Sequence, residues 1–168
     1  MKLFLKITLL LLIIFTANTA CTQKTKDTIT IILLRHAEKD TINPQNPPLS
    51  VAGIKRAEKL PSVFPNIKPG VFYTTNTTRT RETITPWAKL AGKELEVYDA
   101  NKQQEFAELL KQQTGKIIVV AGHSNTVPQL VNFLTGTTNY SSLPDDEYSR
   151  IFIVTILDRK AEVKIESY

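Results

Sequence analysis

The stretch that decides the fold is TITIILLRHAE, residues 28–38. Residues 28–34 are all aliphatic or β-branched, which is typical of a strand that is buried on both faces. The next four residues are Arg35-His36-Ala37-Glu38, and three of them carry ionisable side chains. Because ligands collect at the carboxyl ends of strands in open α/β sheets, we expect a functional site directly after this strand.

The same alternation continues along the chain. Further strands are expected at 71–75, 95–98, 116–121, 151–157 and 161–167, and helices at 50–60, 77–91, 102–113 and 127–134. This order predicts an α/β fold, a three-layer sandwich in which a mainly parallel sheet is flanked by helices. Only the turn Asp158-Arg159-Lys160 separates the last two strands, so they should form a C-terminal strand pair. No linker divides residues 28–168, which we expect to form one domain.

Helix boundaries follow from capping and breaking residues. Ser50 is a suitable N-cap for the first helix, and Pro61 is expected to end it. In the second helix, Pro86 is expected to produce a kink and Gly92 to provide the stop. The residues expected to face the core are Ile54, Ala57 and Leu60 in the first helix and Phe106, Leu109 and Leu110 in the third.

The first 20 residues differ from the rest of the chain. Two lysines, Lys2 and Lys6, precede the apolar run 7–15, and small or polar residues follow up to position 20. This layout predicts a secretory signal peptide, because the apolar run is shorter than the roughly 20 residues of a membrane span. An uncleaved N-terminal anchor is the alternative.

Cys21 is the only cysteine and follows Ala20 directly. This position resembles the lipobox of bacterial lipoproteins, although Asn18 stands where an aliphatic residue is usual. We therefore expect a lipoprotein signal over 1–20, lipidation of Cys21 and a polar tether over 21–27. The protein would be exported to the periplasm or cell envelope and anchored to the membrane. Simple cleavage after Ala20 is the alternative.

Composition excludes several classes of function. The formal net charge is +5 and the basic residues are spread along the chain, so nucleic-acid binding is not indicated. With Cys21 at a processed terminus, no cysteine remains for a disulfide or a thiolate metal site. His36, His123 and the scattered carboxylates lack the close spacing of known metal sites, so we expect no metal and no cofactor.

Both histidines of the chain, His36 and His123, directly follow expected strands. Arg35 precedes the first histidine, and Arg79 lies in the first turn of the helix after the second strand. A neutral imidazole is a competent nucleophile, and arginine forks match the equatorial oxygens of a phosphoryl group. These residues therefore indicate metal-independent phosphoryl chemistry. The alternative is a pair of structural loop histidines.

Four motifs make this hypothesis more specific. They are LLRHAEK at 33–39, LSVAGIKRA at 49–57, YTT with RTRET at 73–75 and 79–83, and VAGHSN at 120–125. In this order they resemble the motifs of the histidine phosphatase superfamily, the group that contains the phosphoglycerate mutases. The similarity covers about residues 28–157 and implies a phosphoglycerate mutase-like fold.

The resemblance also implies roles for single residues. His36 would become phosphohistidine, and Arg35, Arg79 and His123 would complete the phosphate pocket. The other motif residues would have lesser roles: Glu38 and Glu82 would orient arginines or be solvated carboxylates, Arg56 and Arg81 would lie at the surface, and Thr75 and Ser124 would donate to the substrate.

The chain departs from the family at the proton donor. Acid-phosphatase members carry an aspartate directly after the second histidine, where this chain has Ser124. Asp99, after the third strand, is the candidate donor, and its alternative role is to cap the helix that begins near Asn101. Without a donor, turnover would favour substrates with good leaving groups. The chain is too short for the insertions of the mutase branch, which argues against a mutase.

The resulting expectation is metal-independent phosphomonoester hydrolysis by an exported phosphatase, with a small phosphorylated metabolite or a surface glycan as substrate. A phosphohistidine (protein) phosphatase and a catalytically weak anion-binding lipoprotein are the alternatives. The pocket rim should come from residues 40–48 and 135–150, where Asn43, Asn46, Tyr140 and Tyr148 are the candidate contacts.

Overall fold

The computed structural model describes residues 27–42 and 45–168. The expected signal peptide, Cys21, most of the tether and Asn43 lie outside the described residues. The strands are β1 (Ile29–Arg35), β2 (Val71–Thr74), β3 (Leu95–Val97), β4 (Ile117–Gly122), β5 (Arg150–Leu157) and β6 (Lys160–Ser167). They form one sheet in the order β3-β2-β4-β1-β5-β6.

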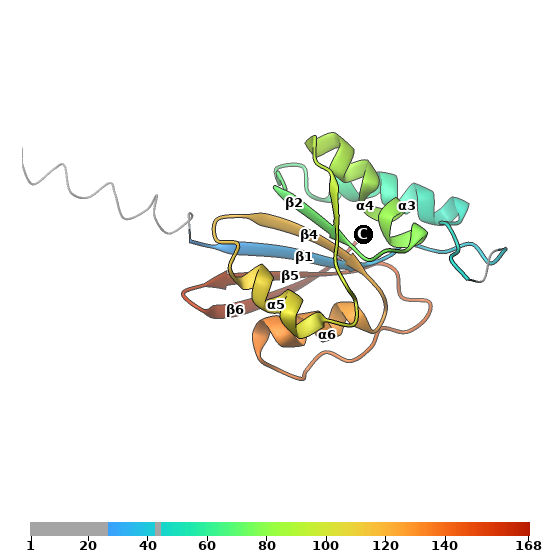
Figure 1. The fold of residues 1–168 in the computed structure, drawn as a ribbon. Coiled ribbons are helices and arrows are strands. Elements are labelled where there is room, and N and C mark those ends of the chain that lie inside the picture. The colour runs from blue at the N-terminus through green and yellow to red at the C-terminus, as the bar shows by residue number, and fades with distance from the viewer. Residues whose placement is uncertain (1–26, 43–44) are drawn as a thin grey trace, which may run out of the picture.

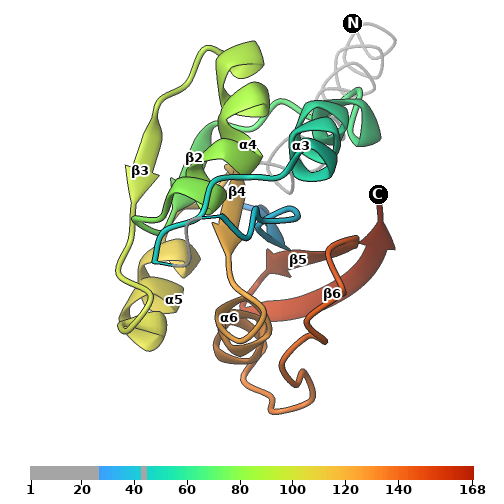
Figure 2. The same cartoon turned by 90° about the vertical axis from the view of Figure 1, so that its right-hand side faces the viewer.

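Four helices flank the sheet in the described part of the chain: α3 (Val51–Val63), α4 (Thr78–Ala91), α5 (Gln103–Lys111) and α6 (Thr126–Thr135). Helices α3 and α4 cover one face and α5 and α6 the other (Figures 1 and 2). Strands β1 to β4 pair in parallel, and β5 and β6 are antiparallel. The predicted three-layer α/β fold with a C-terminal strand pair is confirmed. None of the described helices has the length and apolar character needed to cross a membrane.

The apolar run 31–34 within β1 is explained by burial on both faces. Ile31 and Leu33 pack on the side of α5 and α6, whereas Ile32 and Leu34 pack on the side of α3 and α4. Alternate residues of a strand point to opposite faces, so a central strand with both faces covered needs an apolar residue at every position.

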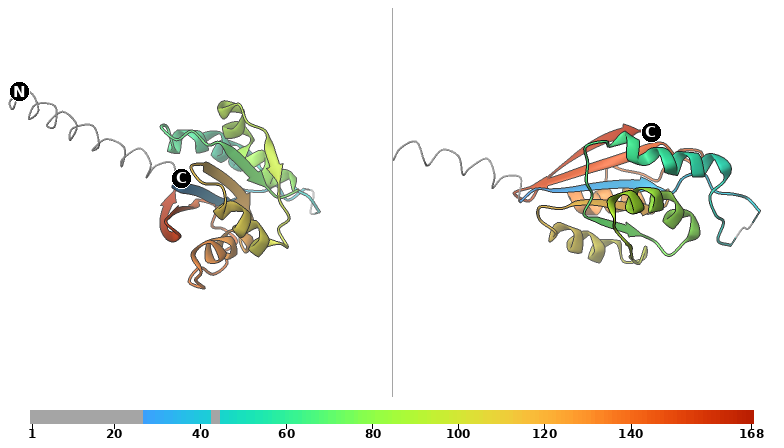
Figure 3. Two further views of the ribbon diagram at one scale, coloured as in Figure 1. Left: turned by 60° about the vertical axis from the view of Figure 1, so that its left-hand side comes forward. Right: turned by 90° about the horizontal axis from the view of Figure 1, so that it is seen from above.

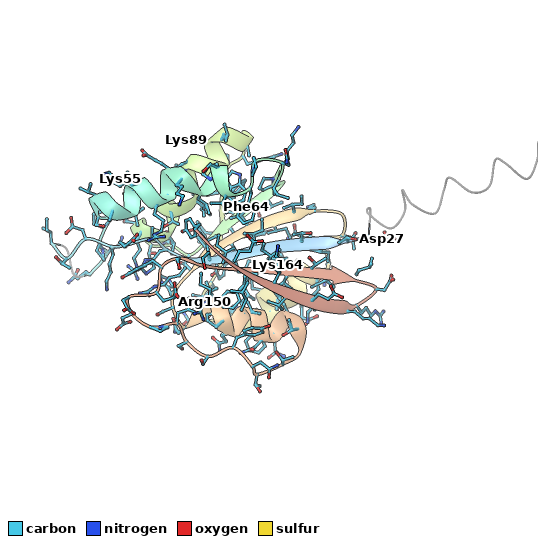
Figure 4. All side chains as sticks on the ribbon, turned by 180° about the vertical axis from the view of Figure 1, so that it is seen from behind. Asp27, Lys55, Phe64, Lys89, Arg150 and Lys164 are labelled. Atoms are coloured by element: carbon cyan, nitrogen blue, oxygen red, sulfur yellow. The ribbon has the colours of Figure 1, made fainter. Side chains whose placement is uncertain are left out.

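The α3 and α4 layer is closed by stacked aromatic rings. Phe64, labelled in Figure 4, ends α3 and stacks on Trp87 of α4 with ring centroids 5.3 Å apart. Trp87 in turn meets Phe72 of β2 edge to face at 5.9 Å. Such pairs stabilise beyond the apolar area that they bury.

Three local predictions are wrong. Pro61 does not end α3, which continues to Val63. Ile54 is half exposed, because Gly53 takes the core position in the first turn of this helix. The buried residues are Gly53, Ala57 and Leu60. Leu109 of α5 is also half exposed, since Ala107 takes the core position instead.

The register of the sheet places the ends of three adjacent strands at one edge. Arg35, the last residue of β1, pairs with Gly122, the last residue of β4, and β2 lies on the other side of β4. The segment that follows β1 projects beyond this edge (Figures 1 and 3). It is closed at its base by the bridge between Lys39 and Leu49. The residues after β1, β2 and β4 therefore converge.

Gly53 is required where α3 meets this edge. A Cβ atom at position 53 would collide with the carbonyl of Glu38, two residues after His36. Because a backbone group cannot rotate away, we expect Gly53→Ala to lower the free energy of unfolding by about 1–3 kcal/mol. Gly70→Ala is the matched control, because its Cβ would meet only the Ile117 carbonyl at 3.9 Å. Denaturant unfolding measures both, and equal stabilities would refute the collision.

Candidate active site

His36 is the first residue after β1 and is only 4% exposed. Its backbone N–H donates to the Gly122 carbonyl at 3.0 Å, which continues the pairing with β4. Its Nδ1 lies 2.7 Å from the Ala37 carbonyl oxygen. Since a carbonyl oxygen only accepts, Nδ1 carries the proton and Nε2 holds the free electron pair. The neutral imidazole is therefore oriented as a nucleophile with Nε2 available.

Thr83 of α4 holds the backbone beside His36. The Ala37 N–H donates to Thr83 Oγ1 at 2.9 Å, and this hydroxyl donates to the Arg79 carbonyl at 2.7 Å. The contact links the nucleophile to the helix that carries Arg79. Sequence reasoning missed this role, although Thr83 lies four residues after Arg79 and hence on the same face of the helix.

His123, the first residue after β4, lies beside His36 with ring centroids 5.6 Å apart. Its Nδ1 lies 3.5 Å from Arg79 Nη2, and its Nε2 lies 3.0 Å from Thr75 Oγ1. A guanidinium only donates, so Nδ1 is the bare nitrogen and Nε2–H donates to Thr75. The predicted convergence of His36, His123 and Arg79 is thus seen in the structure. Thr75 engages the histidine with its hydroxyl instead of facing the site freely.

Both imidazoles are held neutral. Burial lowers the pKa of His36 to about 3, assisted by the charges of Arg79 and Arg35 and opposed by the hydrogen bond to Ala37. Burial also lowers the pKa of His123 to about 4, again with Arg79 and Arg35 contributing. Desolvation and neighbouring positive charge both disfavour an imidazolium. The free electron pair of His36 is therefore available at neutral pH.

Arg35 is a buried cation, 4% exposed, fixed by the segment before β5. Its Nη1 donates to the carbonyls of Pro144, Asp145 and Glu147 at 2.8, 3.0 and 3.1 Å. Its Cζ lies 4.2 Å from the centre of the Tyr148 ring, a cation–π contact. Every residue type has a backbone carbonyl, so a sequence pattern does not indicate which carbonyls accept from Arg35, and these hydrogen bonds could not be predicted.

Two guanidinium N–H groups have no acceptor. Nε of Arg35 and Nε of Arg79 are buried without a hydrogen-bond partner among the described residues. Burial and the charge of Arg35 also lower the pKa of Arg79, although an arginine remains charged. Two cations that disfavour each other beside two neutral imidazoles make a strongly electropositive hollow. Such a site is suited to a phosphoryl group.

Glu38 orients an arginine, but not one of the two in the hollow. Its carboxylate accepts from Nε and Nη2 of Arg56 at 2.7–3.0 Å, and this pairing lowers the pKa of Glu38. Arg56 also donates to the Tyr168 carbonyl at 2.6 Å, so the expectation of a surface residue is wrong. Its side chain is only 24% exposed. The pair joins α3 to the segment after His36.

Glu82 is the second carboxylate for which an arginine partner was considered. It instead accepts from the Leu49 N–H at 2.7 Å and holds the end of the projecting segment. Arg81 donates to Asn76 Oδ1 at 2.8 Å on the outer side of α4. Neither residue joins the group around His36.

Asp99 follows β3 and lines a separate shallow pocket together with Thr75 and His123. Its Oδ1 accepts from the Asn101 N–H at 2.9 Å, so the carboxylate also caps the following turn. Asp99 is not the helix cap of the alternative interpretation, because α5 begins at Gln103 with Lys102 as its N-cap. Ser124 is half buried, and its carbonyl accepts from the Leu143 N–H at 2.9 Å.

Among the expected rim contacts that the structure describes, Tyr148 lies near His36, with ring centroids 6.1 Å apart. Tyr140 packs edge to face on Phe152 in the core at 5.5 Å, so its expected role at the rim is wrong. The side-chain amide of Asn46 binds Thr78 at the start of α4 twice. Its Oδ1 accepts from the Thr78 N–H at 3.0 Å, and its Nδ2 donates to Thr78 Oγ1 at 2.9 Å.

A larger groove opens beside His123, between the first turns of α5 and α6, and has a volume of about 1080 Å³. Besides His123, its polar lining comprises Asn101, Lys102, Gln103, Gln104, Glu105, Glu108, Asn125, Thr126 and Gln129. The sequence did not indicate this groove, because amide and charged residues at helix starts usually mark solvated surface. Residues 27–42 and 45–168 contain no cluster of three or more His, Cys, Asp or Glu that could hold a metal ion.

The neutral state of His36 has a measurable effect on stability. Between its unfolded pKa of 6.5 and its folded pKa of about 3, the unfolded chain binds a proton that the folded chain does not. The free energy of unfolding therefore falls as the pH is lowered, by up to about 1.4 kcal/mol per pH unit from this residue. Unfolding curves measured between pH 4 and 6.5 give the free energy of unfolding at each pH. We expect this free energy to fall less steeply with decreasing pH in His36→Asn than in the wild type. Equal slopes would contradict a neutral buried His36.

The sequence was compared with known families. The family model of the histidine phosphatase superfamily (branch 1) matches residues 31–105. The matched range contains His36 and Arg79 but ends before His123. No curated protein matches the sequence.

Solved phosphatase structures share the fold. A mycobacterial glucosyl-3-phosphoglycerate phosphatase is 12% identical, with a TM-score of 0.66 over 84% of this chain and 98% of that structure. A phosphoserine phosphatase from Entamoeba histolytica in complex with 3-phosphoglyceric acid is 15% identical, with a TM-score of 0.64 over 83% and 98%. The protein histidine phosphatase SixA with bound tungstate is 14% identical, with a TM-score of 0.65 over 82% and 96%. At such low identity these likenesses concern the fold.

Proposed function

The chain belongs to the histidine phosphatase superfamily and is a phosphatase, and we propose that it hydrolyses phosphomonoesters without a metal ion through a phosphohistidine on His36. The observation that carries the proposal is the state of His36. Its Nδ1–H donates to the Ala37 carbonyl at 2.7 Å, its ring is buried and neutral, and His123 lies beside it. The electron pair of Nε2 is thus the nucleophile.

The reaction has two steps. Nε2 of His36 forms a bond to phosphorus while the ester P–O bond breaks, and the leaving oxygen takes up a proton. Water then attacks phosphorus and gives one proton to the carboxylate that lost its proton in the first step, the N–P bond breaks, and the imidazole returns to its neutral form. In both steps charge is distributed over the three phosphoryl oxygens, and Arg35 and Arg79 stabilise it from fixed positions.

Asp99 is the proposed proton donor to the leaving oxygen. It lines a pocket that contains His123 and adjoins the groove beside His123, since the two cavities share His123 and Ala100. For this role its second oxygen carries the proton, because Oδ1 already accepts from the Asn101 N–H. Asp99→Asn is therefore expected to lower the rate of hydrolysis of alkyl phosphates more than that of aryl phosphates, whose leaving groups need no proton.

The groove beside His123 is the proposed site for the leaving group. Its side-chain amides, among them Gln104, Asn125 and Gln129, both donate and accept hydrogen bonds, as hydroxyl groups require. Its two carboxylates are paired with lysines, Glu105 with Lys102 at 3.7 Å and Glu108 with Lys111 at 2.9 Å, so the charged residues of the groove leave no unpaired cation for a second phosphate group. These features support a small hydroxyl-rich phosphoester, a sugar phosphate or a phosphorylated glycan, over a nucleoside diphosphate.

Replacing a groove residue tests this substrate class. We expect Gln129→Leu to raise the KM for a hexose phosphate about 3–10-fold, the value of one lost hydrogen bond, with little effect on phenyl phosphate. Gln112→Leu is the matched control, because Gln112 is an exposed glutamine outside the groove at the end of α5. Equal changes in KM for both substrates would show that the groove does not bind the leaving group.

One observation favours a second candidate, a phosphohistidine phosphatase. Ser124 stands directly after His123, and the Asp99 carboxylate is engaged by the Asn101 N–H. A phosphoramidate has a better leaving group than an alkyl ester and depends less on a proton donor. A ratio of kcat/KM for a phosphohistidine peptide over a sugar phosphate well above 1 would favour this candidate.

Export and lipidation at Cys21 remain part of the proposal. They are supported by the signal-like residues 1–20 and by the position of Cys21 after Ala20. Radiolabelled palmitate should be incorporated into the wild-type chain in a bacterial host and not into Cys21→Ala. A labelled Cys21→Ala variant, or an unlabelled wild type, would refute lipidation at this residue.

The central experiment uses the full chain with an aryl phosphate in buffer containing a metal chelator. We expect phosphate release at an unchanged rate, and a phosphoenzyme trapped by rapid denaturation that is labile in acid and stable in base. Loss of activity with chelator, restored by a divalent cation, would overturn the metal-independent mechanism.

A further inference from the structure

Thr75 and Thr80 form a buried hydroxyl pair behind His123, 3% and 0% exposed. Thr75 Oγ1 lies 3.0 Å from His123 Nε2 and 3.0 Å from Thr80 Oγ1. A hydroxyl group has one proton and can accept as well as donate, so each of these two contacts can run in either direction. We propose that this pair supports both tautomers of neutral His123, so that its proton lies on Nε2 without a phosphoryl group and, after Nε2 has released one proton to solvent and Nδ1 has taken one up, lies on Nδ1 when a phosphoryl group enters the hollow.

In the structure the hydrogen bonds run away from His123. Nε2–H donates to Thr75, Thr75 donates to Thr80, and Thr80 donates to the carbonyl of Thr75 or Thr77 at 3.0 Å. Nδ1 is then bare and faces Arg79 Nη2 at 3.5 Å. A bare nitrogen cannot donate to a phosphoryl oxygen, so this arrangement is unsuited to binding the anion.

The reversed arrangement is equally complete. Thr80 then donates to Thr75, Thr75 donates to Nε2, and Nδ1 carries the proton. The carbonyl of Thr75 can spare the Thr80 hydroxyl, because it also accepts from Thr77 N–H at 2.9 Å and from Thr74 Oγ1 at 3.1 Å. The carbonyl of Thr77 accepts from the Arg81 N–H at 3.2 Å. None of the threonine hydroxyls and carbonyls of this chain loses its last partner, so reversal costs little on the Nε2 side of His123.

The anion decides between the two arrangements. With the hollow empty, Nδ1–H would point at another donor, Arg79 Nη2, which is unfavourable. Two donors 3.5 Å apart can share one oxygen at about 2.8–2.9 Å from each, so a phosphoryl oxygen turns this repulsion into two hydrogen bonds. Thr75 is therefore a positioning residue. The inference rests on the proposed function, since it assumes that a phosphoryl group occupies the hollow.

Nitrogen-15 NMR of the full chain tests the proposal without turnover. The chain has only two histidines, so His36→Gln assigns their signals. We expect His123 to carry its proton on Nε2 without ligand and on Nδ1 with saturating inorganic phosphate. An unchanged tautomer, or an imidazolium with both nitrogens protonated in the complex, would overturn the proposal. Neither result depends on hydrolysis, so failure of the proposed function would appear separately, as no phosphate release from an aryl phosphate.

Variants of the pair sharpen the test. In Thr80→Val, Thr75 keeps only His123 Nε2 as acceptor, so Nδ1–H is expected even without phosphate. In Thr75→Val the histidine loses its partner, and we expect inorganic phosphate to bind about tenfold more weakly. Thr75→Ser restores both the wild-type tautomers and the affinity. A Thr80→Val protein that keeps Nε2–H without phosphate would contradict the hydroxyl relay.

Discussion

Replacement of His36 by glutamine is expected to lower kcat for an aryl phosphate at least about 10⁴-fold, because no other group can supply the attacking electron pair. His36 is buried, and its Nδ1–H is committed to the Ala37 carbonyl, which leaves Nε2 as the nitrogen with the free electron pair. His123 cannot replace it, since Nε2 of that ring contacts Thr75 and Nδ1 faces Arg79.

Three measurements make this expectation specific. The trapped acid-labile phosphoenzyme should disappear in His36→Gln, while inorganic phosphate should still bind through Arg35, Arg79 and His123. Thermal unfolding should show a folded protein. A variant that still forms a base-stable phosphoenzyme would place the covalent intermediate on another residue and refute the role of His36.

The sequence could predict the convergence because it depends on topology. A parallel sheet aligns the carboxyl ends of its strands, so His36 after β1 and His123 after β4 had to lie at one edge. The two strands are neighbours, and Arg35 pairs with Gly122 at their ends. The centroids of the two imidazole rings therefore lie 5.6 Å apart. Hydrophobic periodicity located each strand within one or two residues.

The partners of the charged side chains could not be predicted. Arg56 reaches Tyr168, 112 residues away, and Arg35 is held by carbonyls of residues 144–147. Such contacts join segments that meet only in the folded state, and a carbonyl belongs to every residue type. The histidine tautomers were hidden for the same reason, since they follow from which acceptor or donor each ring nitrogen meets.

Arg79 is the residue whose replacement should have the second largest effect. It lies in the first turn of α4, at the edge where His36 and His123 meet, and its buried Nε has no acceptor among the described residues. Its backbone is fixed, because its carbonyl accepts from Thr83, which also accepts from the Ala37 N–H. The backbone that carries this guanidinium is therefore fixed, and its Nη2 lies 3.5 Å from His123 Nδ1, as electrostatic stabilisation of a transition state by positioned donors requires.

We expect Arg79→Lys to lower kcat/KM about 10²–10³-fold although the charge is retained, because an ammonium group cannot donate to two phosphoryl oxygens from one fixed plane. Arg81→Lys is the matched control. It lies two residues later on the same helix, contacts Asn76 on the outer side, and should stay within about twofold of the wild type. If Arg79→Lys also stayed within that range, the two guanidinium groups would not act as a pair on the phosphoryl group, and Arg35 with His123 would have to stabilise the transition state alone.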